Sequence, residues 1–405
     1  MAAAAIGCQA TAVDSAGRAR ALAFAVQPVD ASANQLITPA VRVVVLDASG
    51  DTVRDFAGSV TISLGATTTG AVLSGTVTQP VANGVATFAD LSINRSGGGY
   101  TLSARAPGLG DAISGEFGVR CLLNCWNALT AMPTRRTLLA TGVLNGAVYA
   151  VGGFASGQRS AKVEAYDPAA NSWTTKAALP TARFGLGVGV VNGVLYAVGG
   201  ALSGANPTNA VEAYDTVTNH WTTRALLPTP RLGLGVAVVN GRLFAIGGDI
   251  GNGHDTAVVE MYDPTTDTWV AKAPLPSGRA YFGTAVVGGV IYVVGGDADG
   301  SSIAQTLAYD PVTNTWTSRA PLAVARSSLS AASVDGYVYA VGGNDTQVVG
   351  TVERYDPVGN VWVSRAPLLV PRALLSVGEL GGLLYAIGGS TVTASFLATN
   401  EAYQP

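Results

Sequence analysis

Two residue patterns recur six times in strict register through the C-terminal two thirds of the chain. Six Gly-Gly pairs begin at Gly152, Gly199, Gly247, Gly295, Gly342 and Gly388. Six tryptophans lie at Trp126, Trp173, Trp221, Trp269, Trp316 and Trp362. Each tryptophan precedes its Gly-Gly pair by 26 residues. A fixed period of this length predicts an array of stacked structural units.

Three further positions follow the same register. An aromatic residue lies three positions before each Gly-Gly pair, and a Glu-x-Tyr follows every pair except one, where the chain has Leu307-Ala308-Tyr309. An arginine lies ten residues after each tryptophan, at Arg136, Arg183, Arg231, Arg279, Arg326 and Arg372. Because several residue types keep fixed offsets through six copies, the repeat is specific.

The repeat resembles the kelch motif, and the resemblance extends from Cys125 to Pro405. It implies an all-β fold, a six-bladed kelch β-propeller with four antiparallel strands per blade. The residues agree locally, since Asn192-Gly193 between two apolar runs predicts a tight hairpin. The chain ends before the last repeat reaches its tryptophan, so the strand around Trp126 is expected to complete that blade and close the ring.

The region before the repeats predicts a separate domain. We assign 1–19 to a flexible N-terminal segment, 20–120 to a β-sandwich and 121–405 to the propeller. Alternating apolar residues predict strands such as Val41–Leu46 and Val85–Phe88, separated by turns such as Asn83-Gly84. This region resembles the bacterial immunoglobulin-like domains that space out the modules of surface proteins.

Composition excludes several classes of protein. The net charge is −3, with 23 basic and 26 acidic residues and no basic stripe, so we expect no nucleic-acid binding. No apolar run approaches the roughly 20 residues of a transmembrane helix. Charged residues are only 12% of the chain and hydrophobic residues 48%, which is typical of a folded protein with a large core.

The chain has three cysteines. Cys121 and Cys125 lie four residues apart, which leaves two alternatives: a local disulfide in an oxidising compartment, or two buried thiols. Cys8 follows Ala5-Ile6-Gly7 and is a candidate for lipidation, as at the end of a bacterial lipoprotein signal; a plain flexible start is the alternative.

The offsets locate the variable part of each repeat. All changes in length fall between the Gly-Gly pair and the Glu position, which is the loop between the second and third strands. On a rigid scaffold, binding and catalytic residues tend to lie in such loops. The candidate polar residues there are Asp249, His254, Asp255, Asp297, Asp299 and Asp345. Solvated turns explain these residues, and a weaker alternative is a calcium site at Asp297 and Asp299.

The six arginines have two interpretations. As a ring near the channel they are candidate ligands for an anion through forked hydrogen bonds. Alternatively, each pairs with a framework glutamate of its own repeat, since buried charges need partners and the two series recur together. In one repeat Leu307 stands in place of the glutamate, so one arginine is expected to be freer than the others.

No catalytic residues can be nominated. The chain has only two histidines and no Ser–His–Asp or Cys–His set. We therefore predict no enzyme, no cofactor and no resident metal. The leading hypothesis is an extracellular, cell-surface or periplasmic bacterial protein that binds protein or carbohydrate at the propeller loop face. The alternatives are a self-associating subunit of a surface appendage, and a sugar mutarotase resembling the N-acetylneuraminate epimerases.

Overall fold

The structure, a computed structural model, describes residues 19–65, 71–203 and 206–405. The chain divides into two compact units, Met1–Leu122 and Leu123–Pro405. Both are built from β-strands. No helix in the described ranges has the length and apolarity needed to cross a membrane.

The described residues of the N-terminal unit form four small sheets. The first has β1 (Ala21–Val26), β3 (Val41–Leu46) and β7 (Val85–Phe88), and the second has β11 (Ala112–Ile113), β10 (Leu102–Arg105), β4 (Ser59–Leu64) and β6 (Thr78–Pro80). The others are β2 (Ala31–Ser32) with β12 (Phe117–Arg120) and β9 (Gly97–Tyr100), and β5 (Leu73–Ser74) with β8 (Ser92–Ile93).

Strand alternation builds the core of this unit. Along β3 the side chains of Val41, Val43 and Val45 are buried while Arg42 is exposed, because successive residues of a strand point to opposite faces. Residues from the first two sheets join one apolar cluster. Thr101 separates β9 from β10, so the chain from Tyr100 to Ala104 is not one continuous strand.

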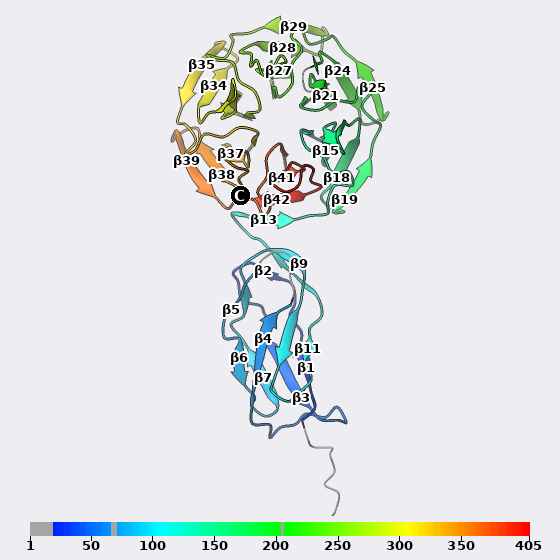
Figure 1. Cartoon of the computed structure of the whole chain (residues 1–405), viewed down its shortest axis with the longest axis vertical. Coiled ribbons are helices and arrows are strands. Elements are labelled where there is room, and N and C mark those ends of the chain that lie inside the picture. The colour runs from blue at the N-terminus through cyan, green and yellow to red at the C-terminus, as the bar shows by residue number, and fades with distance from the viewer. Residues whose placement is uncertain (1–18, 66–70, 204–205) are drawn as a thin grey trace, which may run out of the picture. The chain divides into compact units, whose positions relative to one another are not determined.

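The second unit is a propeller of six four-stranded antiparallel sheets, named blades 1 to 6 in chain order (Figure 1). The innermost strands are β14 (Ala140–Leu144), β20 (Gly187–Val191), β26 (Gly235–Val239), β30 (Gly283–Val287), β36 (Ser330–Val334) and β40 (Ser376–Leu380). The second strands are β15 (Ala147–Val151), β21 (Val194–Val198), β27 (Arg242–Ile246), β31 (Val290–Val294), β37 (Tyr337–Val341) and β41 (Leu383–Ile387).

The outer half of each blade holds the remaining two strands. The third strands are β18 (Val163–Asp167), β24 (Val211–Asp215), β28 (Val259–Asp263), β34 (Thr306–Asp310), β38 (Val352–Asp356) and β42 (Asn400–Gln404). The outermost are β19 (Ser172–Thr175), β25 (His220–Thr223), β29 (Thr268–Ala271), β35 (Thr315–Arg319), β39 (Val361–Arg365) and β13 (Cys125–Ala128). Short hairpins add β16 (Phe154–Ala155), β17 (Gln158–Arg159), β22 (Ala201–Ser203), β23 (Asn206–Pro207), β32 (Asp297–Ala298) and β33 (Ser301–Ser302).

The ring is closed by pairing the two ends of the repeat array. Strand β13 pairs with β42, with Trp126 opposite Tyr403. Blade 6 therefore takes its outermost strand from the start of the array and the other three from its end, as the repeat register predicts. No blade in the described propeller is left with three strands.

The repeated tryptophans join neighbouring blades. Each packs on the tyrosine of its own blade, with ring centroids 4.8–5.2 Å apart. Each indole N–H donates to a backbone carbonyl of the preceding blade, as from Trp221 to Ala177 at 2.9 Å. In the closing blade, Trp126 donates in the same way to Ala366 at 3.0 Å. The tryptophan period is thus the period of the blade interfaces.

Candidate binding face of the propeller

The loops that follow the Gly-Gly pairs gather at one end of the central channel, and this end is called the loop face below. Both glycines of each pair have positive φ, 63° and 103° at Gly152 and Gly153. A Cβ on Gly153 would lie 2.8 Å from the Thr137 carbonyl oxygen, so a side chain has no room there. The Gly153 N–H donates to the Arg183 carbonyl of the next blade at 2.9 Å. The Gly-Gly pair thus ties each loop to the following blade.

A closed ring of backbone hydrogen bonds surrounds the channel at this end. The donor and acceptor residues lie two positions after each arginine, and they are Leu138, Gly185, Gly233, Tyr281, Ser328 and Leu374. Each N–H donates to the carbonyl of the residue one blade earlier at 2.7–3.0 Å, and Leu138 donates to Leu374 to complete the circle. All six have φ between 52° and 61°, the left-handed region that costs a non-glycine residue energy.

The six framework arginines are buried, which favours a framework role over direct contact with a ligand. Each is at most 1% exposed. Five pair with a glutamate of the same blade: Arg136 with Glu164 at 2.7 Å, Arg183 with Glu212, Arg231 with Glu260 at 2.6 Å, Arg326 with Glu353 at 3.1 Å and Arg372 with Glu401 at 2.7 Å. These five ion pairs agree with the interpretation in which each arginine pairs with a framework glutamate of its own repeat.

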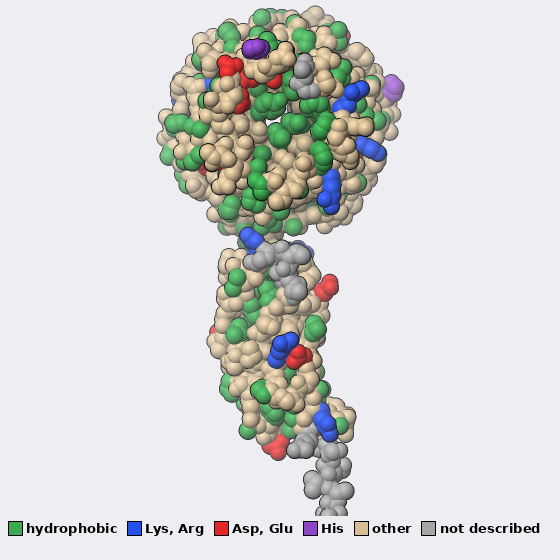
Figure 2. All heavy atoms as spheres, viewed as in Figure 1, with side chains coloured by type: hydrophobic (Ala, Val, Ile, Leu, Met, Phe, Trp, Pro, Cys, Tyr) green, Lys and Arg blue, Asp and Glu red, His purple; other side chains and the backbone are tan. Residues whose placement is uncertain are grey.

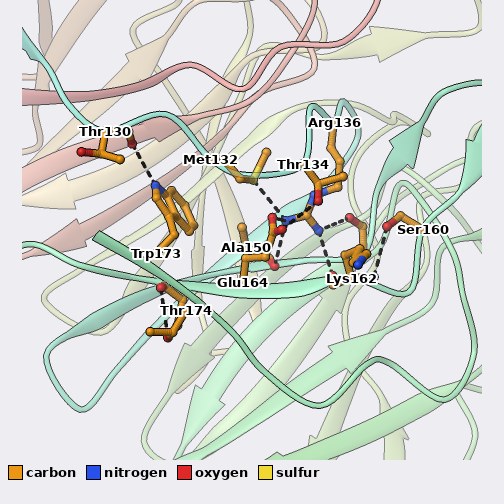
Figure 3. Close-up of polar contacts among 12 residues, drawn as sticks. Thr130, Met132, Thr134, Arg136, Ala150, Ser160, Lys162, Glu164, Trp173 and Thr174 are labelled. Carbon is orange, nitrogen blue, oxygen red and sulfur yellow. Dashed lines mark hydrogen bonds and ion pairs between the residues drawn. The ribbon is translucent and has the colours of Figure 1, made fainter. Parts of the chain in front are cut away.

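Blade 1 shows how completely such a pair is enclosed (Figure 3). The Arg136 guanidinium donates to Glu164 and to the carbonyls of Gly152 and Lys162, each of these two at 2.8 Å. Glu164 also accepts a hydrogen bond from the Thr134 hydroxyl at 2.8 Å. Burial lowers the pKa of Arg136, and attraction to Glu164 partly offsets that shift.

Blade 4 departs from this arrangement. Arg279 is fully buried, and Leu307 stands where the other blades have glutamate. Its Nη2 donates to the amide oxygen of Gln305 and to the Ser277 hydroxyl at 3.4 Å, while Nε and Nη1 have no partner among the described residues. Burial lowers the pKa of Arg279 to about 10. The arginine that the sequence marked as different is therefore unpaired with any carboxylate, yet not exposed.

Small side chains line the channel itself. The innermost strands contribute residues such as Gly187, Gly235 and Ala331 around a cavity of about 170 Å³. Glu379 lies toward the opposite end, where it lines a second cavity of about 300 Å³ with Ser333 and Asp335. Its carboxylate accepts the Gly382 N–H at 2.9 Å.

The loops of blades 3 and 4 bring four carboxylates together, and these four residues are called the acidic sector below. They are Asp249, Asp255, Asp297 and Asp299. Asp255 and Asp299 bind each other's loops, because the Asp299 N–H donates to the Asp255 carboxylate at 3.0 Å and the Asp255 N–H donates back at 3.4 Å. Burial raises the pKa of Asp255 to about 6, with repulsion from the other three adding to the shift.

The remaining candidates of these loops have local roles. His254 is exposed, and its carbonyl accepts the Ile250 N–H at 3.0 Å. Asp345 lies in the blade 5 loop, where its carboxylate accepts the Gln347 N–H at 2.9 Å. In the part of the chain that the structure describes, no group of three His, Cys, Asp or Glu side chains is placed to hold a metal ion. Asp297 and Asp299 belong to no such group, and the calcium alternative stays a prediction.

An apolar pocket of about 710 Å³ lies over blades 1 and 2, and it is called the aromatic pocket below. Its lining residues are Leu138, Phe154, Gly157, Gln158, Arg159, Ala182, Phe184, Leu202 and Ser203. The rings of Phe154 and Phe184 meet edge to face with centroids 5.1 Å apart. The sequence interpretation missed this pocket. Its one local signal is Phe154, which follows Gly-Gly where the other repeats have Ala, Asp, Asn or Ser.

The loop face is chemically uneven (Figure 2). Hydrophobic side chains surround the channel mouth, and acidic side chains gather to one side of it. The acidic sector belongs to the loops of blades 3 and 4, whereas the exposed Arg159 lines the aromatic pocket over blades 1 and 2. A ligand that spans this face would therefore meet different chemistry at its two ends.

Two of the three cysteines form a disulfide. Cys121 and Cys125 are both disulfide-bonded, which selects the first of the two alternatives for this pair. Cys8, the lipidation candidate, lies outside the described residues.

Comparisons with known proteins agree with this architecture. Residues 185–389, about half of the chain, match the KLHDC2/KLHL20/DRC7 Kelch-repeats domain, and residues 135–180 match the Kelch motif. The solved structure titled "Structure of YjhT" aligns with a TM-score of 0.61 at 18% identity, covering 67% of this chain and 95% of that one. At this identity the likeness shows the fold alone. No curated protein matches the chain.

Proposed function

The chain belongs to the kelch-repeat family, and from that premise we propose that it is a binding protein whose propeller presents the loop face to a macromolecular partner. Kelch propellers commonly bind proteins. The observation that carries the proposal is the aromatic pocket of about 710 Å³, which opens among the loops that vary in length between repeats. Pockets lined by aromatic side chains are preferred positions for the anchor residues of a partner.

We further propose that the protein acts outside the cytoplasm, at a bacterial cell surface or in the periplasm. The disulfide between Cys121 and Cys125 supports this location, because disulfides persist in oxidising compartments. The N-terminal unit supports it through its likeness to the immunoglobulin-like spacers of surface proteins. A spacer would hold the binding domain away from its attachment point.

The test presents the full-length protein to extracellular and periplasmic protein fractions and to a glycan array. We expect the loop-face variant Arg159→Glu to lose a partner that the wild type retains. The rim variant Val358→Asn should keep that partner, because Val358 is 96% exposed on an outer turn of blade 5, away from the loop face. Identification of the retained protein by mass spectrometry completes the experiment.

The catalytic alternative makes the opposite prediction. A sugar mutarotase would accelerate anomer exchange of N-acetylneuraminate, which NMR measures directly. Such acceleration, abolished by a loop-face variant and accompanied by no retained macromolecule, would overturn the binding proposal. Size-exclusion chromatography tests the third alternative, since a subunit of a surface appendage should assemble as its concentration rises.

A further inference from the structure

A continuous apolar cluster crosses the loop face. Phe184, Ala201 and Leu232 form its buried base, and Leu138, Phe154 and Tyr281 pack on it while remaining partly exposed. The cluster starts in the aromatic pocket over blades 1 and 2 and ends at Tyr281 in blade 4. It therefore joins the aromatic pocket to the region of the acidic sector.

Tyr281 marks the meeting of the two regions. Burial raises the pKa of Tyr281 to about 12, and the neighbouring charges of Asp249, Asp255 and Asp297 add to the shift. The phenol therefore lies within electrostatic range of three members of the acidic sector. One end of the apolar cluster thus borders on carboxylates, whereas the nine residues that line the aromatic pocket include none.

Among the described residues, no lysine, arginine or histidine forms an ion pair with a carboxylate of the acidic sector. The causes that shift Asp255 include three neighbouring aspartates and no basic side chain. Crowded carboxylates of one sign are stabilised when a cationic group approaches them. Charge complementarity therefore favours a partner that is positively charged at this end and apolar at the other.

We infer that the loop face binds a protein segment that inserts an apolar side chain into the aromatic pocket and lays a lysine or arginine against the acidic sector. The inference rests on the proposed function and specifies the partner's chemistry. A protein segment fits better than a carbohydrate, because cationic groups are ordinary in proteins and rare in glycans. The acidic sector and the aromatic pocket belong to different blades, so the segment must reach from blades 1 and 2 to blades 3 and 4.

The test selects binders from a phage-displayed library of random peptides against the full-length protein. We expect enriched peptides to share an aromatic or large aliphatic residue and a nearby lysine or arginine. Synthetic peptides are then measured by fluorescence anisotropy. Replacing the apolar residue by alanine, or the basic residue by glutamine, should each weaken binding about tenfold.

Protein variants assign the two contacts. The double variant Asp255→Asn/Asp299→Asn should weaken binding of the basic peptide about tenfold and leave the affinity for its glutamine analogue unchanged. Leu202→Ala at the aromatic pocket should weaken binding of both the basic peptide and its glutamine analogue. Asp345→Asn is the matched control, since Asp345 is a half-buried loop carboxylate on blade 5 outside the acidic sector. Circular dichroism confirms that each variant folds.

Acidic pH should weaken binding of the basic peptide, because protonation of Asp255 removes one negative charge from the acidic sector. The titratable groups facing Asp255 are Asp249, Asp297, Asp299 and Tyr281, with His254 beside it in the chain. The variant His254→Gln separates any effect of the imidazole. Affinity should fall between pH 7 and pH 5 in wild type and in His254→Gln alike.

Three outcomes would overturn the inference: no enriched peptide, enriched peptides without a basic residue, or affinity indifferent to Asp255→Asn/Asp299→Asn. Glycan binding lost in Leu202→Ala would overturn it in favour of a carbohydrate ligand. These failures differ from failure of the proposed function. If a retained protein still needs Arg159 but ignores the acidic sector and Leu202, only the present inference falls. If no macromolecule binds at all, the proposed function falls as well.

Discussion

Blades 2 and 4 have the same four-stranded architecture, but their buried arginines have different partners. In blade 2, Arg183 meets the Glu212 carboxylate, and its Nη2 donates to the Ala197 carbonyl at 3.0 Å. In blade 4, Arg279 is equally buried but has Leu307 in place of the carboxylate. Among the described residues, only the Gln305 amide and, in a long contact, the Ser277 hydroxyl accept hydrogen bonds from its guanidinium.

The backbone connection between neighbouring blades does not depend on the arginine–glutamate pair. In both blades the main-chain carbonyl of the arginine accepts the N–H of the preceding Gly-Gly pair, from Gly153 to Arg183 and from Gly248 to Arg279. The backbone connection between blades is thus kept where the glutamate is lost. A buried cation without a carboxylate costs stability, so blade 4 should be the weak point of the ring.

The largest effect is expected when blade 2 is made to resemble blade 4. Glu212→Leu leaves Arg183 buried without a carboxylate, which should cost about 3–5 kcal/mol in the free energy of unfolding. Chemical denaturation followed by tryptophan fluorescence measures the loss. Glu116→Leu is the control, since Glu116 is exposed and its replacement should have little effect.

The double variant Ala210→Gln/Glu212→Leu sharpens this comparison. Position 210 corresponds to Gln305, so the new amide should recover part of the lost stability. If Glu212→Leu were as stable as the wild type, the ion pairs would contribute nothing and the comparison between the blades would fail.

Removing the substitute partner from blade 4 should have the next largest effect. Gln305→Leu deprives the Arg279 guanidinium of its amide acceptor, and leaving a buried charged donor unsatisfied should cost about 2 kcal/mol. The midpoint of urea denaturation reports the change. The control is Gln347→Leu, at an exposed glutamine of the blade 5 loop, and an equal loss in both variants would contradict the role given to Gln305.

The sequence allowed prediction of the features that repeat. The offsets predicted six blades, the closing strand at Trp126 and the partners of five arginines, because each depends on a contact that recurs at the same spacing. Leu307 was recognised as an exception because it broke that register. The kelch likeness added the four-stranded blade to this framework.

Contacts that occur once could not be predicted in the same way. Gln305 takes the place of the missing glutamate as the partner of Arg279. It lies two positions before the glutamate position of the repeat, so no fixed offset predicted it. The aromatic pocket joins Phe154 and Phe184 from the loop regions of two blades, and its shape depends on side-chain packing that has no periodic pattern. The gathering of aspartates was foreseeable from the adjacency of their blades, but the raised pKa of Asp255 depends on its burial.

Giving blade 4 the usual carboxylate should stabilise the propeller. Leu307→Glu places a glutamate where five other blades have one, and pairing with Arg279 should add about 1–2 kcal/mol. The arginine should depress the pKa of the new carboxyl, so the gain should be present at neutral pH and disappear as the pH falls through that depressed value. Thermal unfolding at pH 7 and pH 3 measures it. Leu307→Gln should gain less, and a loss in Leu307→Glu would mean that blade 4 has repacked around leucine.

The smallest effect is expected at Asp255 in the blade 3 loop. Its backbone carbonyl packs against Gly278, which precedes Arg279 in the chain. The pKa of Asp255 is raised from 3.8 to about 6, so the folded protein holds this proton more tightly, and its stability should fall as the pH rises from 4 to 6. Asp255→Asn removes that penalty and should gain about 1 kcal/mol at pH 7 after allowance for solvent screening, with no gain at pH 4. Denaturation midpoints at both pH values test this. Asp345→Asn should show no gain at pH 7, because the hydrogen bond from Gln347 lowers the pKa of Asp345 instead.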